Sequence, residues 1–149
     1  MSKKKILFIC THNSCRSQMA EGLLNHFCSD EFQAYSAGVK QTSVHKRAIQ
    51  VMKEIDIDIS HHRSKLVDEF KDTTFDYVVT VCDHAKETCP FFPGKIVLHK
   101  GFTDPGTSKV TTEEQLNEFR EVRDEIKQWI LNYFCNSDQS RLKDFDVYV

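Results

Sequence analysis

Two residue types that suit oxyanion chemistry stand six positions apart near the start of the chain. Cys10 ends an apolar run at residues 6–9, and Arg16 and Ser17 follow. A thiolate is a strong nucleophile, and an arginine offers a planar fork of hydrogen-bond donors to a tetrahedral oxyanion. The Ser17 hydroxyl can donate a hydrogen bond to the sulfur. The spacing predicts an anion-binding loop with a nucleophile at its base, and we call residues 10–17 the anion loop.

The elements on either side of the anion loop fit this chemistry. Residues 6–9 suit a strand buried on both faces, and an amphipathic helical pattern begins directly after Ser17. The first amides of such a helix point into the loop, where their partial positive charge attracts anions and favours a thiolate. We expect substrate binding by the residues that follow the nucleophile: Thr11, His12, Asn13, Ser14, Cys15, Arg16 and Ser17.

A structural interpretation of Cys10 is also available. Cysteine often simply packs in a core, and a C-x5-R spacing alone is common. The strand before Cys10, the helix after it and the adjacent Ser17 favour the functional interpretation.

Composition restricts the class of protein. The chain has 149 residues and a formal net charge of −2, so we expect one domain over residues 1–149, with a polar tail at 135–149, and no nucleic-acid partner. No apolar run approaches membrane-spanning length, and the first lysines lead straight into a strand. A cytoplasmic monomer without a membrane partner is expected.

The cysteines and histidines do not form a recognisable metal motif. There are six cysteines and seven histidines, with no C-x2-C pair and no zinc-finger spacing. No metal site is expected. In a cytoplasmic protein the cysteines should be reduced at rest, and any disulfide is then more readily catalytic than structural.

The order of elements predicts an α/β fold. Strand patterns alternate with helical ones, which predicts a four-stranded parallel sheet with helices on both faces. The expected strands are residues 6–9, 32–37, 77–81 and 95–98, and the expected helices run from 17 to about 28, over 45–55, briefly after 64, and from 111 or 112 to 133. Cys10, Cys82 and the loop around Asp104 all follow strand ends. Because ligands bind beyond the carboxyl ends of parallel strands, we expect these residues to meet at one edge.

A second pair of cysteines suggests redox chemistry. Cys82 and Cys89 bracket six residues, which is too many for a rigid redox pair, but a flexible segment could bring the sulfurs to bonding distance. Together with Cys10 they suggest a relay in which one thiol attacks, a second resolves and a third carries the disulfide to the surface. The alternative is two unrelated buried cysteines.

Asp104 stands in a loop that should lie over the site. Its carboxyl could protonate a leaving oxygen or accept a proton from an incoming thiol. The alternative is an Asp-Pro turn residue, which the following Pro105 would also fit.

Over most of residues 4–134 the chain resembles the thioredoxin-coupled arsenate reductases, the branch built on the low-molecular-weight protein tyrosine phosphatase fold. The matching motifs are residues 10–17 (CTHNSCRS), 35–38 (YSAG), 58–60 (DIS), 82, 89–90 (CP) and 104–105 (DP). The anion loop and the Asp-Pro motif are shared with the phosphatases. The pair Cys82 and Cys89 singles out the reductases.

The resemblance implies a stepwise reaction with arsenate. Cys10 attacks arsenate held by the loop amides and Arg16, while Asp104 protonates the departing oxygen. Cys82 then attacks Cys10 and releases arsenite, and Cys89 attacks Cys82. The resulting Cys82–Cys89 disulfide is exposed for thioredoxin, which acts as an external reductant. Cys15 and Cys135 have no required step.

Three features depart from the pattern of the family, and one of them is the tail beyond Phe134, which is longer than in the compact members. His12 stands where the loop usually has glycine, which adds bulk and an imidazole near the anion. Some members bind potassium through ligands that match Asn13, Glu21 and Ser36, but their aspartate corresponds to Lys65 here. We therefore expect weak or absent potassium dependence, with the Lys65 ammonium in place of the cation, and no bound cofactor.

Two other functions use the same residues. A low-molecular-weight tyrosine phosphatase would form a phosphocysteine at Cys10 and use Arg16 and Asp104, and weak phosphatase activity is expected even of a reductase. Phosphatases of this fold usually carry tyrosines after Asp-Pro, whereas residues 106–108 here are Gly-Thr-Ser. A non-catalytic redox or phosphoprotein-binding module would retain its ligand without turnover.

Overall fold

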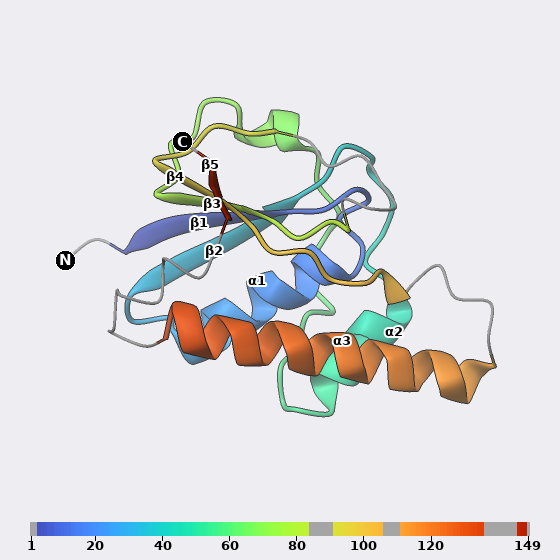
Figure 1. Cartoon of the computed structure of the whole chain (residues 1–149). Coiled ribbons are helices and arrows are strands. Elements are labelled where there is room, and N and C mark those ends of the chain that lie inside the picture. The colour runs from blue at the N-terminus through green and yellow to red at the C-terminus, as the bar shows by residue number, and fades with distance from the viewer. Residues whose placement is uncertain (1–2, 84–90, 106–110, 136–145, 149) are drawn as a thin grey trace.

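A parallel β-sheet forms the centre of the protein (Figure 1). The structure, a computed structural model, describes residues 3–83, 91–105, 111–135 and 146–148. Strand β1 (Lys4–Ile9) has β2 (Phe32–Ala37) on one side and β3 (Tyr77–Thr80) on the other, and β4 (Ile96–His99) follows β3. All three pairings are parallel, which confirms the predicted four-stranded sheet.

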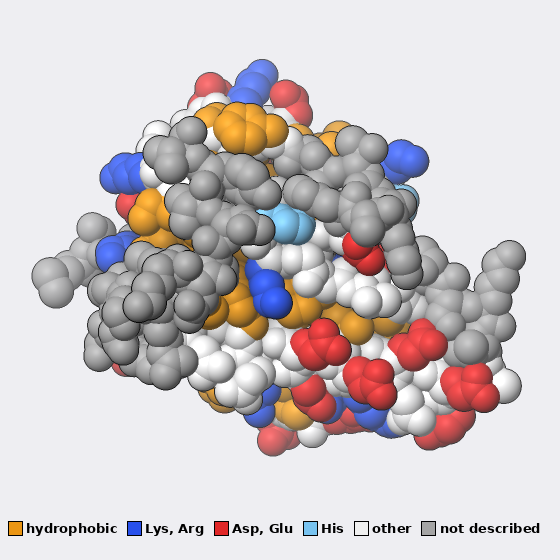
Figure 2. All heavy atoms as spheres, in the orientation of Figure 1, with side chains coloured by type: hydrophobic (Ala, Val, Ile, Leu, Met, Phe, Trp, Pro, Cys, Tyr) orange, Lys and Arg blue, Asp and Glu red, His pale blue; other side chains and the backbone are white. Residues whose placement is uncertain are grey.

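Three α-helices connect or follow these strands: α1 (Arg16–Phe27), α2 (Lys46–Lys53) and α3 (Thr112–Tyr133). The start of α3 is fixed by the side chain of Thr111, which accepts a hydrogen bond of 3.2 Å from the Glu114 amide. This cap confirms the predicted helix start. The outer face of α3 is acidic, and Figure 2 shows this cluster of carboxylates on the molecular surface. Its exposed members are Glu113, Glu114, Glu121, Asp124 and Glu125.

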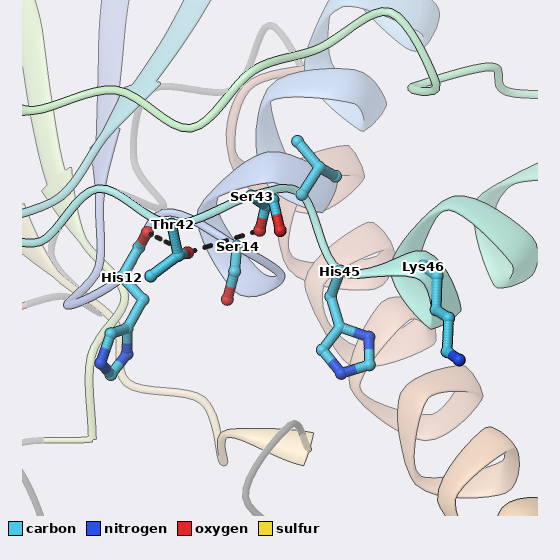
Figure 3. A pocket seen from close by; sticks show the side chains of 7 residues that line it. His12, Ser14, Thr42, Ser43, His45 and Lys46 are labelled. Carbon is cyan, nitrogen blue, oxygen red and sulfur yellow. Dashed lines mark hydrogen bonds between the residues drawn. The ribbon is translucent and has the colours of Figure 1, made fainter.

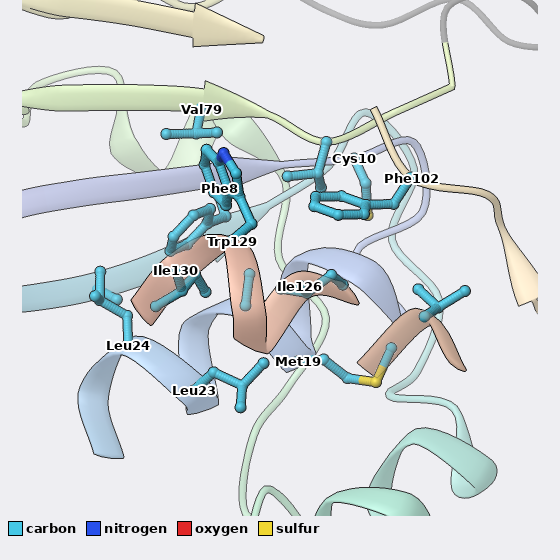
Figure 4. Packing of buried hydrophobic residues seen from close by; sticks show 14 of the residues in the cluster. Phe8, Cys10, Met19, Leu23, Leu24, Val79, Phe102, Ile126, Trp129 and Ile130 are labelled. Atoms are coloured by element: carbon cyan, nitrogen blue, oxygen red, sulfur yellow. The ribbon is translucent and has the colours of Figure 1, made fainter. Parts of the chain in front are cut away.

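The three described α-helices lie on the same side of the sheet (Figure 1), where α1 and α3 pack against it and α2 packs against α3 and α1. Phe8 and Val79 of the sheet meet Met19, Leu23 and Ile126 there in one buried cluster (Figure 4). Burial of such side chains contributes about 1.5–3 kcal/mol each.

The opposite face of the sheet carries the brief helix expected after residue 64, which is the 3-10 helix η1 (Val67–Phe70). Within the described residues, loop residues such as Phe75 and Phe92 cover the rest of this face. Aromatic side chains that pack edge-on, such as Phe75 against Phe70 at 5.7 Å between ring centroids, cover this face in place of longer helices.

The tail adds a fifth strand that the sequence did not predict. Strand β5 (Asp146–Tyr148) pairs antiparallel with β4, so the sheet order is β2-β1-β3-β4-β5. Within the described residues, no helix has the length and apolar character needed to cross a membrane.

Candidate active site around Cys10

The sheet order brings three strand ends together. Strands β1, β3 and β4 are neighbours and parallel, with Ile9 opposite Thr80 and Thr80 opposite His99. Cys10 directly follows β1, Cys82 lies two residues after β3, and Asp104 lies in the loop after β4. The sheet topology therefore places these residues at the same carboxyl edge of the sheet, as the sequence predicted.

The nucleophile candidate is buried and hydrogen-bonded. Cys10 is a free thiol with 2% of its surface exposed, and its sulfur lies 2.9 Å from the Ser17 hydroxyl oxygen. The side-chain amide of Asn13 donates to the same oxygen at 2.7 Å. Since Asn13 occupies an acceptor position of the hydroxyl, the Ser17 proton can point at the sulfur, where it stabilises a thiolate.

Asn13 holds the anion loop in shape. Its backbone has φ of 52°, in the left-handed region that asparagine tolerates better than most residues. Its side-chain oxygen accepts hydrogen bonds from the Lys65 amide (2.8 Å) and the Gln18 side chain (2.9 Å). Gln18 also donates to the Arg63 carbonyl at 2.9 Å. These bonds tie the loop to the segment after α2.

Arg16 is buried beside Asp104. It is 1% exposed, and its guanidinium donates to the Phe102 carbonyl at 3.2 Å and lies 3.5 Å from the Asp104 carboxylate. The carbonyl and the carboxylate both belong to the loop after β4. Arg16 therefore connects the anion loop to the carboxyl group predicted to act as acid.

Cys15 also lies beside Asp104, but its surroundings disfavour the thiolate that a nucleophile needs. Its sulfur lies 3.5 Å from the Asp104 carboxylate. Burial, together with the charge of Asp104 and then that of Cys10, raises the pKa of the Cys15 thiol to about 12. Cys15 stays a neutral thiol at pH 7, which agrees with its having no required step.

Cys82 is fully buried next to the nucleophile. Its sulfur lies 3.8 Å from the carbonyl oxygen of Ile9, the residue before Cys10, and Cys82 is disulfide-bonded in this structure. Cys89 lies outside the described residues.

A charged cluster lies behind the anion loop. The Lys65 ammonium is 2.8 Å from the Arg63 carbonyl oxygen and 3.7 Å from the Glu21 carboxylate, which also accepts a hydrogen bond of 2.5 Å from Ser36. Burial lowers the pKa of Lys65, and the Glu21 charge acts in the opposite direction. His62 lies 3.6 Å from the other Glu21 oxygen, and burial lowers its pKa as well. Among the described residues, no group of acidic, histidine or cysteine side chains could hold a metal ion.

Two pockets lie near the anion loop and differ in their lining. One has a volume of about 430 Å³, and Figure 3 shows the imidazoles of His12 and His45 and the Lys46 ammonium around it. The other, about 360 Å³, is lined by Asp104 with Glu118 and Glu121 of α3. The carboxylates disfavour an oxyanion in the second pocket, whereas the first carries the Lys46 ammonium; burial lowers the pKa of His45 there, which disfavours its charged form.

Removal of the Ser17 hydroxyl should slow reactions of Cys10. In a Ser17→Ala variant the sulfur loses its hydrogen bond, which we expect to reduce the rate of Cys10 alkylation by iodoacetamide at pH 7 roughly 10- to 100-fold. Ser14→Ala is the matched control, because the Ser14 hydroxyl contacts Cys15 at 3.6 Å and should matter less. Equal rates for Ser17→Ala and wild type would mean that Ser17 does not support the thiolate.

Sequence reasoning missed several supporting residues. Gln18 was not singled out, although it ties Asn13 to Arg63. Gly38 entered only as the last residue of the motif at 35–38; a Cβ added there would lie 2.7 Å from the Thr11 carbonyl oxygen and 2.8 Å from that of Cys10. The sequence shows the glycine, but it does not show that Gly38 lies against the anion loop.

Comparison with known proteins agrees with this geometry. The family model for low molecular weight phosphotyrosine protein phosphatase matches residues 5–144. An arsenate reductase of Halalkalibacterium halodurans is 46% identical over 134 residues, which cover 89% of this chain and 96% of that protein. Arsenate reductase 2 of Staphylococcus saprophyticus is 46% identical over 137 residues, or 91% of this chain and all of that protein.

Solved structures show the same relationship. An arsenate reductase in its reduced state has a TM-score of 0.69 and 31% identity, covering 87% of this chain and 95% of that one. A thioredoxin-dependent arsenate reductase of Corynebacterium glutamicum has a TM-score of 0.57 and 26% identity, covering 88% of this chain and 64% of that one. The chain belongs to the low molecular weight phosphotyrosine protein phosphatase family and, within it, groups with the arsenate reductases.

Proposed function

We propose that the protein is an arsenate reductase that converts arsenate to arsenite through Cys10, Cys82 and Cys89, with thioredoxin as reductant. The observation that supports it most is the position of Cys10. Its sulfur lies within hydrogen-bonding distance of the Ser17 hydroxyl, inside a loop that ends at the N-terminus of α1. Cys82 lies just after β3, the strand beside β1. The relatives named arsenate reductase at 46% identity give the substrate.

The first step uses the anion loop. The Cys10 thiolate attacks the arsenic atom of arsenate and displaces one oxygen, which Asp104 protonates so that it leaves as water. Arg16 and the first amides of α1 balance the charge of the oxyanion. The Arg16–Asp104 contact of 3.5 Å keeps the acid beside the anion site.

The second step transfers two electrons. The Cys82 thiolate attacks the Cys10 sulfur, the sulfur–arsenic bond breaks, and its electron pair reduces arsenic from As(V) to As(III). Cys89 then attacks Cys82, which frees Cys10 as a thiolate and leaves a Cys82–Cys89 disulfide. A thioredoxin dithiol reduces that disulfide and is itself oxidised. A thioredoxin partner and a cytoplasmic location belong to this proposal.

A Cys89→Ser variant tests the relay. With arsenate, thioredoxin, thioredoxin reductase and NADPH, the wild-type chain should oxidise NADPH continuously. The variant should complete at most one turnover, because the Cys10–Cys82 disulfide has no internal thiol to resolve it. The measurement is NADPH absorbance at 340 nm, with Cys135→Ser as the matched control that keeps continuous turnover.

Other outcomes of the same assay would contradict the proposal. Equal steady rates for Cys89→Ser and wild type would remove Cys89 from the mechanism. Full phosphatase activity on an aryl phosphate without arsenate-linked NADPH oxidation would favour the tyrosine phosphatase, and tight retention of the oxyanion without any product would favour a binding module.

We further propose that Lys65 supplies the positive charge that potassium supplies in some relatives. Its backbone amide bonds to Asn13, and its ammonium lies by Glu21, the same carboxylate that Ser36 contacts. The ammonium thereby sits among the residues that match the potassium ligands of the family.

Turnover should consequently be the same in KCl and in NaCl at matched ionic strength. The measurement is the steady rate of arsenate-dependent NADPH oxidation as each salt is titrated. A Lys65→Asp variant, which removes the ammonium and restores an oxygen ligand, is expected to become dependent on potassium. A large, saturable stimulation of the wild-type chain by potassium would refute the role of Lys65.

A further inference from the structure

A disulfide connects two cysteines that have no part in the proposed reaction. Cys28, the residue after α1, is bonded to Cys135, the second residue after α3. Their Cα atoms are 5.5 Å apart, and 107 positions separate them in the chain. We call this pair the helix-end disulfide. From the sequence alone Cys135 was expected to have no required step.

The helix-end disulfide lies at the far end of α1 from the anion loop. Helix α1 begins at Arg16 and has 12 residues. At 1.5 Å per residue it separates its two ends by about 18 Å. Direct sulfur-to-sulfur exchange between Cys10 and Cys28 is excluded at that distance, so this pair is chemically separate from the relay.

The surrounding fold holds the two cysteines close together. The Cys28 amide donates to the Leu24 carbonyl at 2.9 Å, and its carbonyl accepts from the Phe32 amide at 3.0 Å where β2 begins. On the other side, Phe134 packs edge-on against Phe32 with ring centroids 5.5 Å apart. These contacts do not depend on the sulfur–sulfur bond, so we expect the two cysteines to stay close together when the disulfide is reduced.

The same residue, Phe134, also connects the pair to the core. It packs against Tyr77 of β3 and against Trp129 of α3, each with ring centroids at 5.5 Å. The end of α3 is thus fixed to the sheet, and α1 and α3 lie side by side (Figure 1).

The two sulfurs differ in access to solvent. Cys28 is 7% exposed, whereas Cys135 is exposed. A small thiol or disulfide from solution can therefore reach Cys135 first, and Cys28 is positioned as the resolving sulfur.

We propose that Cys28 and Cys135 form a second thiol–disulfide exchange site, whose reaction partners are low-molecular-weight thiols and their disulfides. In oxidation, the Cys135 thiolate attacks a small disulfide and expels one small thiolate. Cys28 then attacks the Cys135 sulfur, expels the second small thiolate and completes the bond. Two protein thiols lose two electrons and two protons, and the small disulfide is reduced to two thiols. The oxidised form ties α3 to α1 and resists unfolding.

A full-length Cys10→Ser, Cys82→Ser, Cys89→Ser variant isolates the pair. It is equilibrated with reduced and oxidised glutathione at a series of ratios, trapped with N-ethylmaleimide and mapped by mass spectrometry. We expect a Cys28–Cys135-linked peptide that appears and disappears reversibly with the ratio, while Cys15 stays a thiol throughout. The same map of the wild-type chain, which needs no substitution to fold, should contain the same linked peptide.

Stability is the second readout. Because the disulfide closes a loop of about 107 residues, the oxidised triple variant should have a Tm higher than the reduced form by on the order of 10 °C. Addition of Cys135→Ser should abolish the difference and leave the Tm near that of the reduced form. Fluorescence of Trp129, the single tryptophan, reports the unfolding, because it packs against Phe134.

Two results would overturn this proposal. One is the absence of the linked peptide from both proteins at the most oxidising ratio. The other is a Tm that is the same in the oxidised and reduced forms of the triple variant although the linked peptide is present. Neither measurement uses arsenate, so failure here is distinguishable from failure of the proposed function.

Discussion

A Cys10→Ser variant is expected to lose arsenate-dependent NADPH oxidation by at least about 10⁴-fold, as removal of a nucleophile does in other enzymes. The serine hydroxyl is protonated at pH 7 and cannot form the bond to arsenic. The buried position, the Ser17 contact and Arg16 should persist in the variant, because serine is close to cysteine in size. Activity is measured in the coupled thioredoxin assay at saturating arsenate.

Oxyanion binding separates loss of chemistry from loss of the site. Cys10→Ser should still bind phosphate or arsenate in a calorimetric titration, whereas Arg16→Ala should lose that binding. Residual steady turnover of Cys10→Ser near the wild-type rate would show that another sulfur attacks arsenate.

The second large effect is expected from Gly38→Ala. The added Cβ would lie within 2.9 Å of three backbone atoms of the anion loop, those of Thr11, Cys10 and Asn13, and backbone cannot move aside as a side chain can. We expect a loss of about 1–3 kcal/mol in the free energy of unfolding, measured by urea denaturation. Because misplacement of about 1 Å costs roughly 10²-fold in rate, kcat should fall by at least that factor.

Gly94→Ala provides the matched control. A Cβ at Gly94 would meet the Val78 side chain at 2.6 Å, on the sheet face away from the helices. It should reduce stability without the loss of kcat. If Gly38→Ala kept its kcat while both variants lost similar stability, the close approach of Gly38 would not shape the loop.

The strands and the long helices were predictable from the sequence because local patterns determine them. Residues 6–9 are apolar throughout and lie in a central strand, and Thr111 with Glu114 marks the start of α3. The brief helix expected after residue 64 is likewise found, as η1 (Val67–Phe70). Strand β5 was not predictable in this way, because a strand of three residues is too short to carry a periodic signal and only its tertiary partner decides it.

The residues of the candidate site also fall into a predictable group and an unpredictable one. Cys10, Arg16 and Ser17 were predicted because their residue types and spacing express the chemistry, and the structure places them as expected around the anion loop. The contact of Gly38 with the loop, the bonds of Gln18 and the pairing of Cys28 with Cys135 join segments far apart in the chain. Contacts between such distant segments leave no local pattern in the sequence from which they could be predicted.

Strand β5 also determines how two molecules can meet. Without it, β4 would be the outermost strand, and its unpaired amide and carbonyl groups would be a template for a strand from another copy. Three residues of the chain's own tail pair with His99, Leu98 and Val97 instead. The outermost strand on this side is therefore one of three residues, and so short an edge offers little length for pairing with a strand from another copy.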